Sequence, residues 1–219
     1  MVKKLFSTLI ILALMIASFG GVTFAKGKPL TEKQVNQIKA NFGKAGIDQE
    51  TQLKLIEKIE NGEILGANNP KMKDKGKIKE KKFIDKNGIP GYEKKIIYPD
   101  GSVDITSVSG GTSRTGSGYV NYIGRKVSRL SGGIYASFLA DYTNVQYGYD
   151  SLDRVYEWYI SGVSDISNIT LTVAQSKETS SSDAYGYLRF TGSAGGYYTS
   201  TFYLKLFVGN DTDWDSGNW

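Results

Sequence analysis

The residues of this 219-residue chain that could do chemistry are carboxylates, hydroxyls, lysines and arginines, because the sequence has no cysteine and no histidine. Thiol nucleophiles, Ser-His-Asp triads, disulfide frameworks and ordinary zinc or haem sites are therefore excluded. Glu157, between Tyr156 and Trp158 and near Asp150 and Asp153, is the best remaining catalytic carboxylate. A glycosidase needs two carboxyl groups roughly 5–10 Å apart, but strand alternation directs Glu157 away from its aromatic neighbours. We therefore expect a protein that is not an enzyme, with a carboxylate-based hydrolase as the alternative.

A second group of carboxylates lies near the C-terminus, where Asp211, Asp213 and Asp215 occupy alternate positions, as in a calcium loop. The EF-hand pattern is incomplete, because Ser216 stands where that loop requires glycine. We predict no cofactor, with calcium at these three residues as the weaker hypothesis. If these residues do not bind calcium, we expect residues 210–219 to form a polar tail that contains acids and tryptophan.

Aromatic side chains are the leading candidates for binding, because the chain has 15 tyrosines and three tryptophans. Strand alternation cannot direct all of them inward, so several must lie on an outer face or in loops. Tyrosine joins an apolar ring to a polar tip, which suits carbohydrate stacking, protein contact or a lipid interface. Alternatively, tyrosine is abundant here only because it forms strands well. The predicted binding residues are Tyr147, Tyr149, Tyr156, Trp158 and Trp214.

Lysine is concentrated in residues 71–86, which hold eight lysines against three acids and few apolar groups. Such a segment cannot offset its ordering entropy by burial, so we predict a solvated linker over residues 70–91. Alternatively it is a patch for an anionic phospholipid or cell-wall surface, where each lysine contributes about 1 kcal/mol. The patch would comprise Lys71, Lys73, Lys75, Lys77, Lys79, Lys81 and Lys82. Nucleic acid is not an expected partner, because no stacking aromatics interleave these lysines.

The N-terminus has the pattern of a secretory signal. Lys3 and Lys4 precede an apolar run, and Thr23-Phe24-Ala25 fits a small-x-small cleavage site. We predict a signal peptide over residues 1–25, with an uncleaved anchor as the alternative. A secreted chain without cysteine is typical of Gram-positive bacteria. The expected location is extracellular, with cell-wall association as a further hypothesis.

Residues 26–69 carry the signals of a helical hairpin. Thr31 and Gln34 form a capping box, and Asp48 is a cap for a second helix that ends at Asn61-Gly62. This piece is too short to hold a core alone, so it must pack on another part of the chain or on a partner.

The remaining chain is predicted to be β-structure. Residues 92–109 read as a β-hairpin around Pro99-Asp100-Gly101, and residues 110–118 as a Gly/Ser-rich linker. Residues 119–209 contain six strand-like runs with no helical pattern between them. These runs lie near 119–127, 134–142, 154–160, 169–173, 183–191 and 202–208. The fold class is therefore mainly β, an antiparallel β-sandwich or small barrel preceded by a helical hairpin and a β-hairpin.

Several stretches resemble a known group of proteins. Residues 51–63 (TQLKLIEKIENGE) and 98–102 (YPDGS) resemble the N-terminal region of small secreted proteins of Bacillus-like Gram-positive bacteria. Residues 136–143 (ASFLADYT), 149–150 (YD) and 204–212 (LKLFVGNDT) resemble a C-terminal β-domain of unknown function in that uncharacterised group. The resemblance implies bacterial export and this domain layout, and it assigns no catalytic residues.

The predicted function is that of a secreted, non-enzymatic binding protein that acts at or outside the cell envelope through a tyrosine-rich β-sandwich. Its partner would be an envelope polymer, a membrane surface or another protein, and the oligomeric state is left open. The alternative is a membrane-active toxin or antimicrobial protein with an N-terminal pro-segment, since Ser/Thr-rich alternating strands can form an amphipathic pore hairpin.

Overall fold

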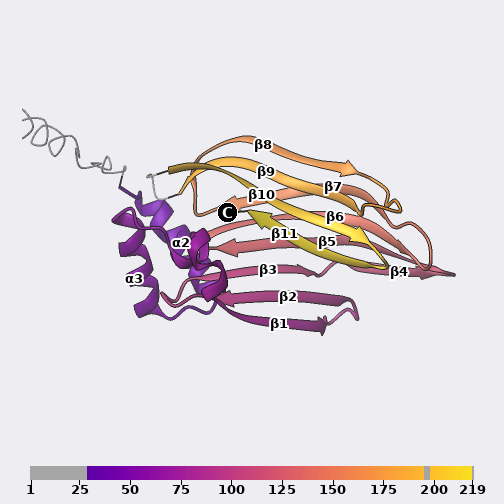
Figure 1. Ribbon diagram of the computed structural model, residues 1–219, viewed down its shortest axis with the longest axis horizontal. Coiled ribbons are helices and arrows are strands. Elements are labelled where there is room, and N and C mark those ends of the chain that lie inside the picture. Colours follow the sequence, from indigo (N-terminus) through magenta and orange to yellow (C-terminus); the bar gives the residue numbers. More distant parts are fainter. Residues whose placement is uncertain (1–28, 195–197, 219) are drawn as a thin grey trace, which may run out of the picture.

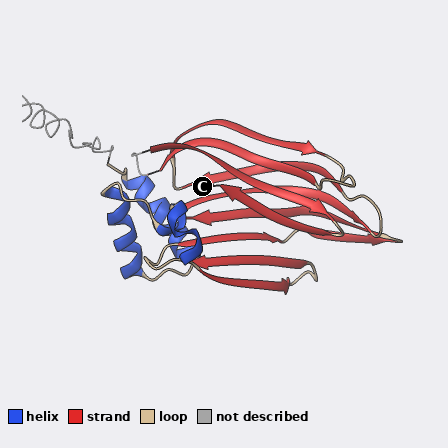
Figure 2. Ribbon diagram, in the orientation of Figure 1, coloured by secondary structure: helices blue, strands red, loops and turns tan. Residues whose placement is uncertain are grey.

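The computed structural model describes residues 29–194 and 198–218, which form two antiparallel β-sheets with a pair of helices at one end (Figure 1). Strands make up more than half of the described residues, whose α-helices all precede the first strand (Figure 2). The predicted signal peptide, residues 1–25, lies outside the described residues. Among the described helices, none is long and apolar enough to cross a membrane.

The helical hairpin predicted from the sequence is present as α2 (Glu32–Lys44) and α3 (Gln49–Glu60). The backbone N–H of Gln34 donates to Thr31 Oγ1 over 3.3 Å, and the backbone N–H of Thr31 donates to Gln34 Oε1 over 2.9 Å. This reciprocal pair is the predicted capping box. Asp48 caps α3 by accepting the backbone N–H of Thr51 over 3.0 Å.

The helices pack against the larger sheet and share a core with it. Phe42 from α2 and Leu55 from α3 are fully buried in a cluster that also contains Val103 and Leu130. Asn41, which is buried, donates to the Gly133 carbonyl over 2.8 Å and to Ser161 Oγ over 3.1 Å. This satisfied polar contact fixes where α2 lies on the sheet.

The larger sheet, called sheet A below, contains seven strands in the order β1-β2-β3-β5-β6-β7, with β4 paired to β5. Two short 3₁₀ segments, η1 (Gly66–Asn68) and η2 (Pro70–Lys75), lead into it. Its strands are β1 (Lys77–Ile84), β2 (Pro90–Ile97), β3 (Val103–Ser109), β4 (Thr112–Gly116), β5 (Tyr119–Ser131), β6 (Ile134–Val145) and β7 (Ser151–Ser161). The predicted hairpin corresponds to β2 and β3, whose turn contains Gly101 at a φ of 84°.

The smaller sheet, called sheet B below, has the order β11-β10-β9-β8. Its strands are β8 (Ser164–Gln175), β9 (Ala184–Ala194), β10 (Tyr198–Gly209) and β11 (Thr212–Asn218). The two sheets enclose one core, to which Phe138 and Tyr142 of β6, Leu188 and Phe190 of β9 and Leu204 of β10 contribute fully buried side chains. The sandwich alternative of the predicted fold class is therefore confirmed.

Three predicted segments have a different structure. The linker predicted over residues 70–91 contains η2 and all of β1, which pairs with β2 from Lys77–Ile97 to Ile84–Pro90. The linker predicted over residues 110–118 contains β4. The tail predicted over residues 210–219 contains β11, paired with β10. In each segment, backbone pairing to a neighbouring strand supplies the order that composition alone does not indicate.

Candidate functional site: the outer face of sheet B

The outer face of sheet B collects aromatic and basic side chains from β9 and β10. Alternation along these strands sends Ala184, Leu188, Phe202, Leu204 and Leu206 into the core. The residues between them point outward and are half-buried. We call this set the aromatic face: Tyr185, Tyr187 and Arg189 from β9, with Tyr203, Lys205 and Phe207 from β10.

Strand register brings these rings together. Phe207 is opposite Tyr185, and their rings stack with centroids 5.6 Å apart and an interplanar angle of 23°. Tyr187 and Tyr203 lie diagonally across the same strand pair, with centroids 6.0 Å apart. Two ring pairs therefore lie side by side on one sheet surface, at separations typical of favourable aromatic contacts.

Two cations accompany the rings. The Arg189 guanidinium lies 5.9 Å from the Tyr203 ring centroid, and Lys205 Nζ lies 5.7 Å from the same centroid. The Arg189 Nε is shielded from solvent and makes no hydrogen bond within the described part of the chain. The face therefore presents apolar rings together with positive charge, a combination that suits a ligand with flat apolar surfaces and anionic groups.

The aromatic face is not covered by the helices. Both helices pack on the opposite sheet, against Ile97, Val103, Ile105, Leu130 and Tyr135 of sheet A. Figure 1 shows them at one end of the sandwich, and neither lies over β8–β11. An open surface with several aromatic side chains is a common mark of a binding site.

Tyr147 and Tyr149, predicted as binding residues, lie in the β6–β7 loop beside a hollow of about 510 Å³. Tyr147 is 95% exposed and Tyr149 is 52% exposed. The loop is held by Asp150, a fully buried residue whose carboxylate accepts the backbone N–H groups of Val145 and Asp211 over 2.7 and 2.9 Å. Burial raises the pKa of Asp150. These two tyrosines are exposed on a well-anchored loop.

Glu178 completes this anchor. It accepts the backbone N–H of Asp150 over 2.9 Å and that of Asn210 over 3.0 Å. The Asp150–Glu178 clasp thus ties the β6–β7, β8–β9 and β10–β11 connections together at one end of the sandwich. Its carboxylates are occupied by backbone donors, so its role is structural.

Tyr156 and Trp158 lie on β7, roughly 20 to 30 Å along the chain direction from Tyr149. Tyr156 donates its hydroxyl to Asp141 over 3.0 Å, and the Arg154 guanidinium lies 4.5 Å from its ring. Burial and this hydrogen bond raise the pKa of Tyr156. Trp158 is 46% exposed. The predicted site is thus divided between a loop and a strand, and its residues do not form one surface.

Strand alternation does not hold around Glu157. Its φ is 51°, and the β6–β7 register shifts between Ser137 and Leu139, which marks a bulge. Glu157, Trp158 and Tyr159 are consequently all exposed. Glu157 is thus an exposed strand residue, as expected from the sequence, but simple alternation does not decide the direction of its side chain at this bulge.

Trp214 is the register partner of Phe207, but its side chain lies outside the described residues, as does that of Asp215. The predicted calcium residues do not form a loop, because Asp213 belongs to β11 and is directed between the sheets. Asp211 lies before the strand, with its backbone N–H bound to Asp150. The described residues contain no group of three or more acids or other ligands suited to a metal ion.

The predicted lysine patch is ordered but is divided between two elements and two faces. Lys71, Lys73 and Lys75 lie in η2, and all seven lysines are exposed. On β1, Glu80 and Lys82 point toward the groove beside β11. The alternate positions, Lys77, Lys79 and Lys81, therefore share the outer side of sheet A, at intervals of roughly 7 Å.

Comparison with protein families, curated proteins and solved structures finds no match to this chain. The aromatic face was not among the predicted sites, although its signal is in the sequence. Tyr185, Tyr187 and Arg189 alternate with Ala184, Gly186 and Leu188, so one side of β9 is aromatic and basic while the other is small or apolar. What the sequence does not give is the register that sets β10 beside it.

Proposed function

We propose that the protein is a non-enzymatic binding protein that holds a polysaccharide of the bacterial cell envelope on the aromatic face. The observation that carries the proposal is the pair of aromatic contacts, Tyr185–Phe207 and Tyr187–Tyr203, on an open sheet surface. Sugar rings have apolar faces that stack on such side chains, while their hydroxyl groups remain hydrated. Arg189 and Lys205 would then contact carboxylate or phosphate groups on the polymer.

Export and envelope location belong to this proposal and rest on the sequence pattern of residues 1–25. The lysines of η2 and β1 are a second source of attraction to the same surface. They lie on an exposed edge of sheet A and add long-range attraction to an anionic wall without fixing the orientation of the ligand.

The test is cosedimentation of the purified mature chain with Gram-positive cell wall. In the double variant Tyr187→Ala/Tyr203→Ala, binding should weaken at least tenfold, about 1.4 kcal/mol, because a ring is lost from the face on each strand. The matched control is Tyr147→Ala/Tyr149→Ala, which removes two exposed tyrosines from the β6–β7 loop and should bind as the parent does.

If the control pair abolishes binding instead, the site belongs to the loop and the aromatic face is not the binding surface. Leakage of anionic vesicles, with no retention on wall, would favour the membrane-active alternative. Circular dichroism of both variants excludes loss of the fold as the cause.

A further inference from the structure

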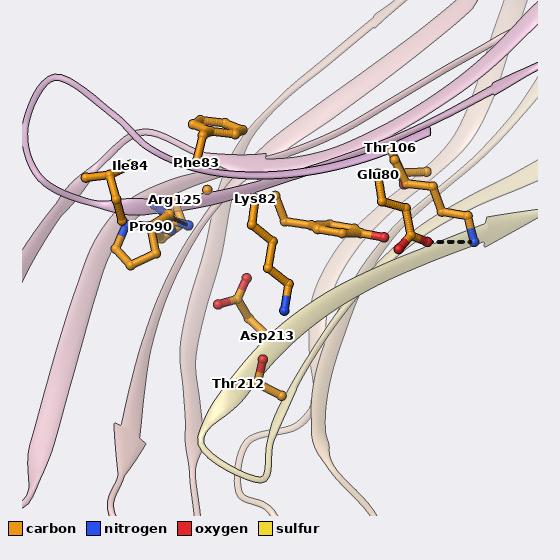
Figure 3. A pocket seen from close by; sticks show the side chains of 12 residues that line it. Glu80, Lys82, Phe83, Ile84, Pro90, Thr106, Arg125, Thr212 and Asp213 are labelled. Atoms are coloured by element: carbon orange, nitrogen blue, oxygen red, sulfur yellow. Dashed lines mark hydrogen bonds and ion pairs between the residues drawn. The ribbon is translucent and has the colours of Figure 1, made fainter. Parts of the chain in front are cut away.

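The two sheets differ in width, and this difference leaves a groove. β11, the edge strand of sheet B, lies against β3, so β1 and β2 extend beyond it. We call residues 77–97 the β1–β2 lobe. Its inner side and the start of β11 enclose a groove of about 950 Å³. Lys82, Ile84, Tyr92, Lys94, Thr212 and Asp213 are among the residues that line it (Figure 3).

One wall of the groove is a strand edge. β10 pairs with one side of β11, and the described residues place no strand on its other side. Thr212 and Asp213 line the groove, so this free side faces it. Strands pair about 4.8 Å apart and sheets pack about 10 Å apart. A strand added beside β11 would therefore lie above the β1–β2 lobe, inside the groove.

The base of the groove is fixed before any ligand binds. Arg125, only 2% exposed, donates Nη1 to the Gly110 carbonyl over 2.7 Å and Nη2 to the Pro90 carbonyl over 2.6 Å. Its Nε donates to the Tyr142 hydroxyl over 3.3 Å, and Tyr142 in turn contacts Asp213. These bonds tie the lobe, β5, β6 and β11 together, which lowers the ordering cost of binding.

The side chains that line the groove carry a net positive charge, because Lys82, Lys94 and Arg125 outnumber Glu80 and Asp213. Lys94 pairs with Glu80 over 3.8 Å, whereas Lys82 is exposed and makes no ion pair among the described residues. Figure 3 shows the Lys82 side chain reaching across the groove toward β11. Ile84, 65% exposed, and Pro90 supply an apolar end. An occupant that matches this wall has an acidic group opposite Lys82 and an apolar group near Ile84.

Pairing of β11 with β11 of a second copy does not fit. If β11 of one copy paired with β11 of another, the joined sheets would place both β1–β2 lobes on the same side. Both lobes would then lie beneath the two β11 strands and occupy the same volume. The space suits a single strand.

We infer that the groove binds an extended acidic peptide, which pairs with the free side of β11 as a fifth strand of sheet B. Backbone hydrogen bonds would provide most of the affinity, and Lys82 and Ile84 would select side chains at alternate positions. This site is separate from the aromatic face.

The test uses fluorescence anisotropy with labelled peptides of defined sequence. A peptide of alternating glutamate and valine should bind saturably. A lysine–valine peptide should not bind, nor should a glutamate–valine peptide with central prolines, which lack the backbone N–H. Lys82→Glu should weaken binding at least tenfold. The matched control is Lys79→Glu, which makes the same charge change on the opposite side of β1 and should leave binding within about twofold.

Equal weakening by both variants would show nonspecific charge attraction and overturn the inference, as would unchanged binding of the proline-containing peptide or absence of saturation. Slower amide hydrogen exchange in β11 on peptide addition is the direct mark of strand pairing. Tyr187→Ala/Tyr203→Ala should still bind the glutamate–valine peptide, because neither tyrosine lines the groove. Failure of this inference and failure of the proposed function can therefore be told apart.

Discussion

The outer faces of the two sheets are built from similar alternating strands but are used differently. On sheet A, outward-facing residues such as Ile105 and Leu130 are covered by α2 and α3. On sheet B, the outward-facing residues are the tyrosines, phenylalanine and cations of the aromatic face, which the helices leave open. The difference indicates that the apolar area of one face serves stability, whereas that of the other is available for a ligand.

From this comparison we expect the largest loss of stability when a residue that covers the outer face of sheet A is truncated. Phe42→Ala should lower the free energy of unfolding by about 3–5 kcal/mol, because Phe42 is fully buried between the helices and sheet A. Tyr187→Ala on the open face should cost only about 1 kcal/mol. Urea denaturation followed by circular dichroism measures both values. Equal losses would show that the open face also supports the fold.

Removal of the positive charges on β1 should have an intermediate effect on cell-wall binding, and this effect should depend on the salt concentration. Changing Lys77, Lys79 and Lys81 together to glutamine should reduce binding to an anionic wall by about 3 kcal/mol at low ionic strength, roughly a hundredfold. The loss should shrink as salt is added. The matched control changes three exposed lysines elsewhere, Lys33, Lys39 and Lys177. If the control loses as much retention on cell wall, net charge and not the β1 edge is responsible.

The smallest expected effect is a loss of stability in acid. Burial alone would raise the pKa of Asp141, but hydrogen bonds from Gly124, Arg154 and Tyr156 outweigh it and hold the pKa below its ordinary value. The stability that Asp141 contributes is therefore present above about pH 4 and is lost as the pH falls through the lowered pKa.

Asp141→Asn should therefore be less stable at neutral pH and show a shallower decline in acid. Thermal unfolding between about pH 6 and 3 measures this decline. Asp74→Asn, at an exposed position in η2, is the control and should follow the parent curve. Parallel curves for the parent and Asp141→Asn would mean that these hydrogen bonds have no net effect on stability.

The fold class could be read from the sequence where one face of a strand is buried. Ala136, Phe138 and Ala140 alternate on β6 and enter the core, and the caps at Thr31 and Asp48 mark the helix starts. β1 could not be recognised in this way, because nearly all its side chains are exposed on both faces. Its order comes from pairing with β2, which composition does not reveal.

The sequence predicts that a tyrosine-rich binding surface exists, but it does not predict which residues form that surface. Tyrosine abundance indicates a binding surface, but which tyrosines share it depends on the β9–β10 register, a contact between separate strands. Positive φ angles at Glu157, Asp165 and Asn168 accompany bulged strands, so positions near them do not follow simple alternation. The face on which Trp158 lies therefore does not follow from its position in the sequence.

The lysines of β1 have one more consequence. β1 ends sheet A, and its outer backbone edge offers hydrogen-bonding groups to any extended chain that approaches. A second molecule that paired there would have to strip water from several ammonium groups and bring like charges together. The same side chains therefore protect the molecule against edge-to-edge fibril growth. Replacing them with valine should cause the protein to aggregate.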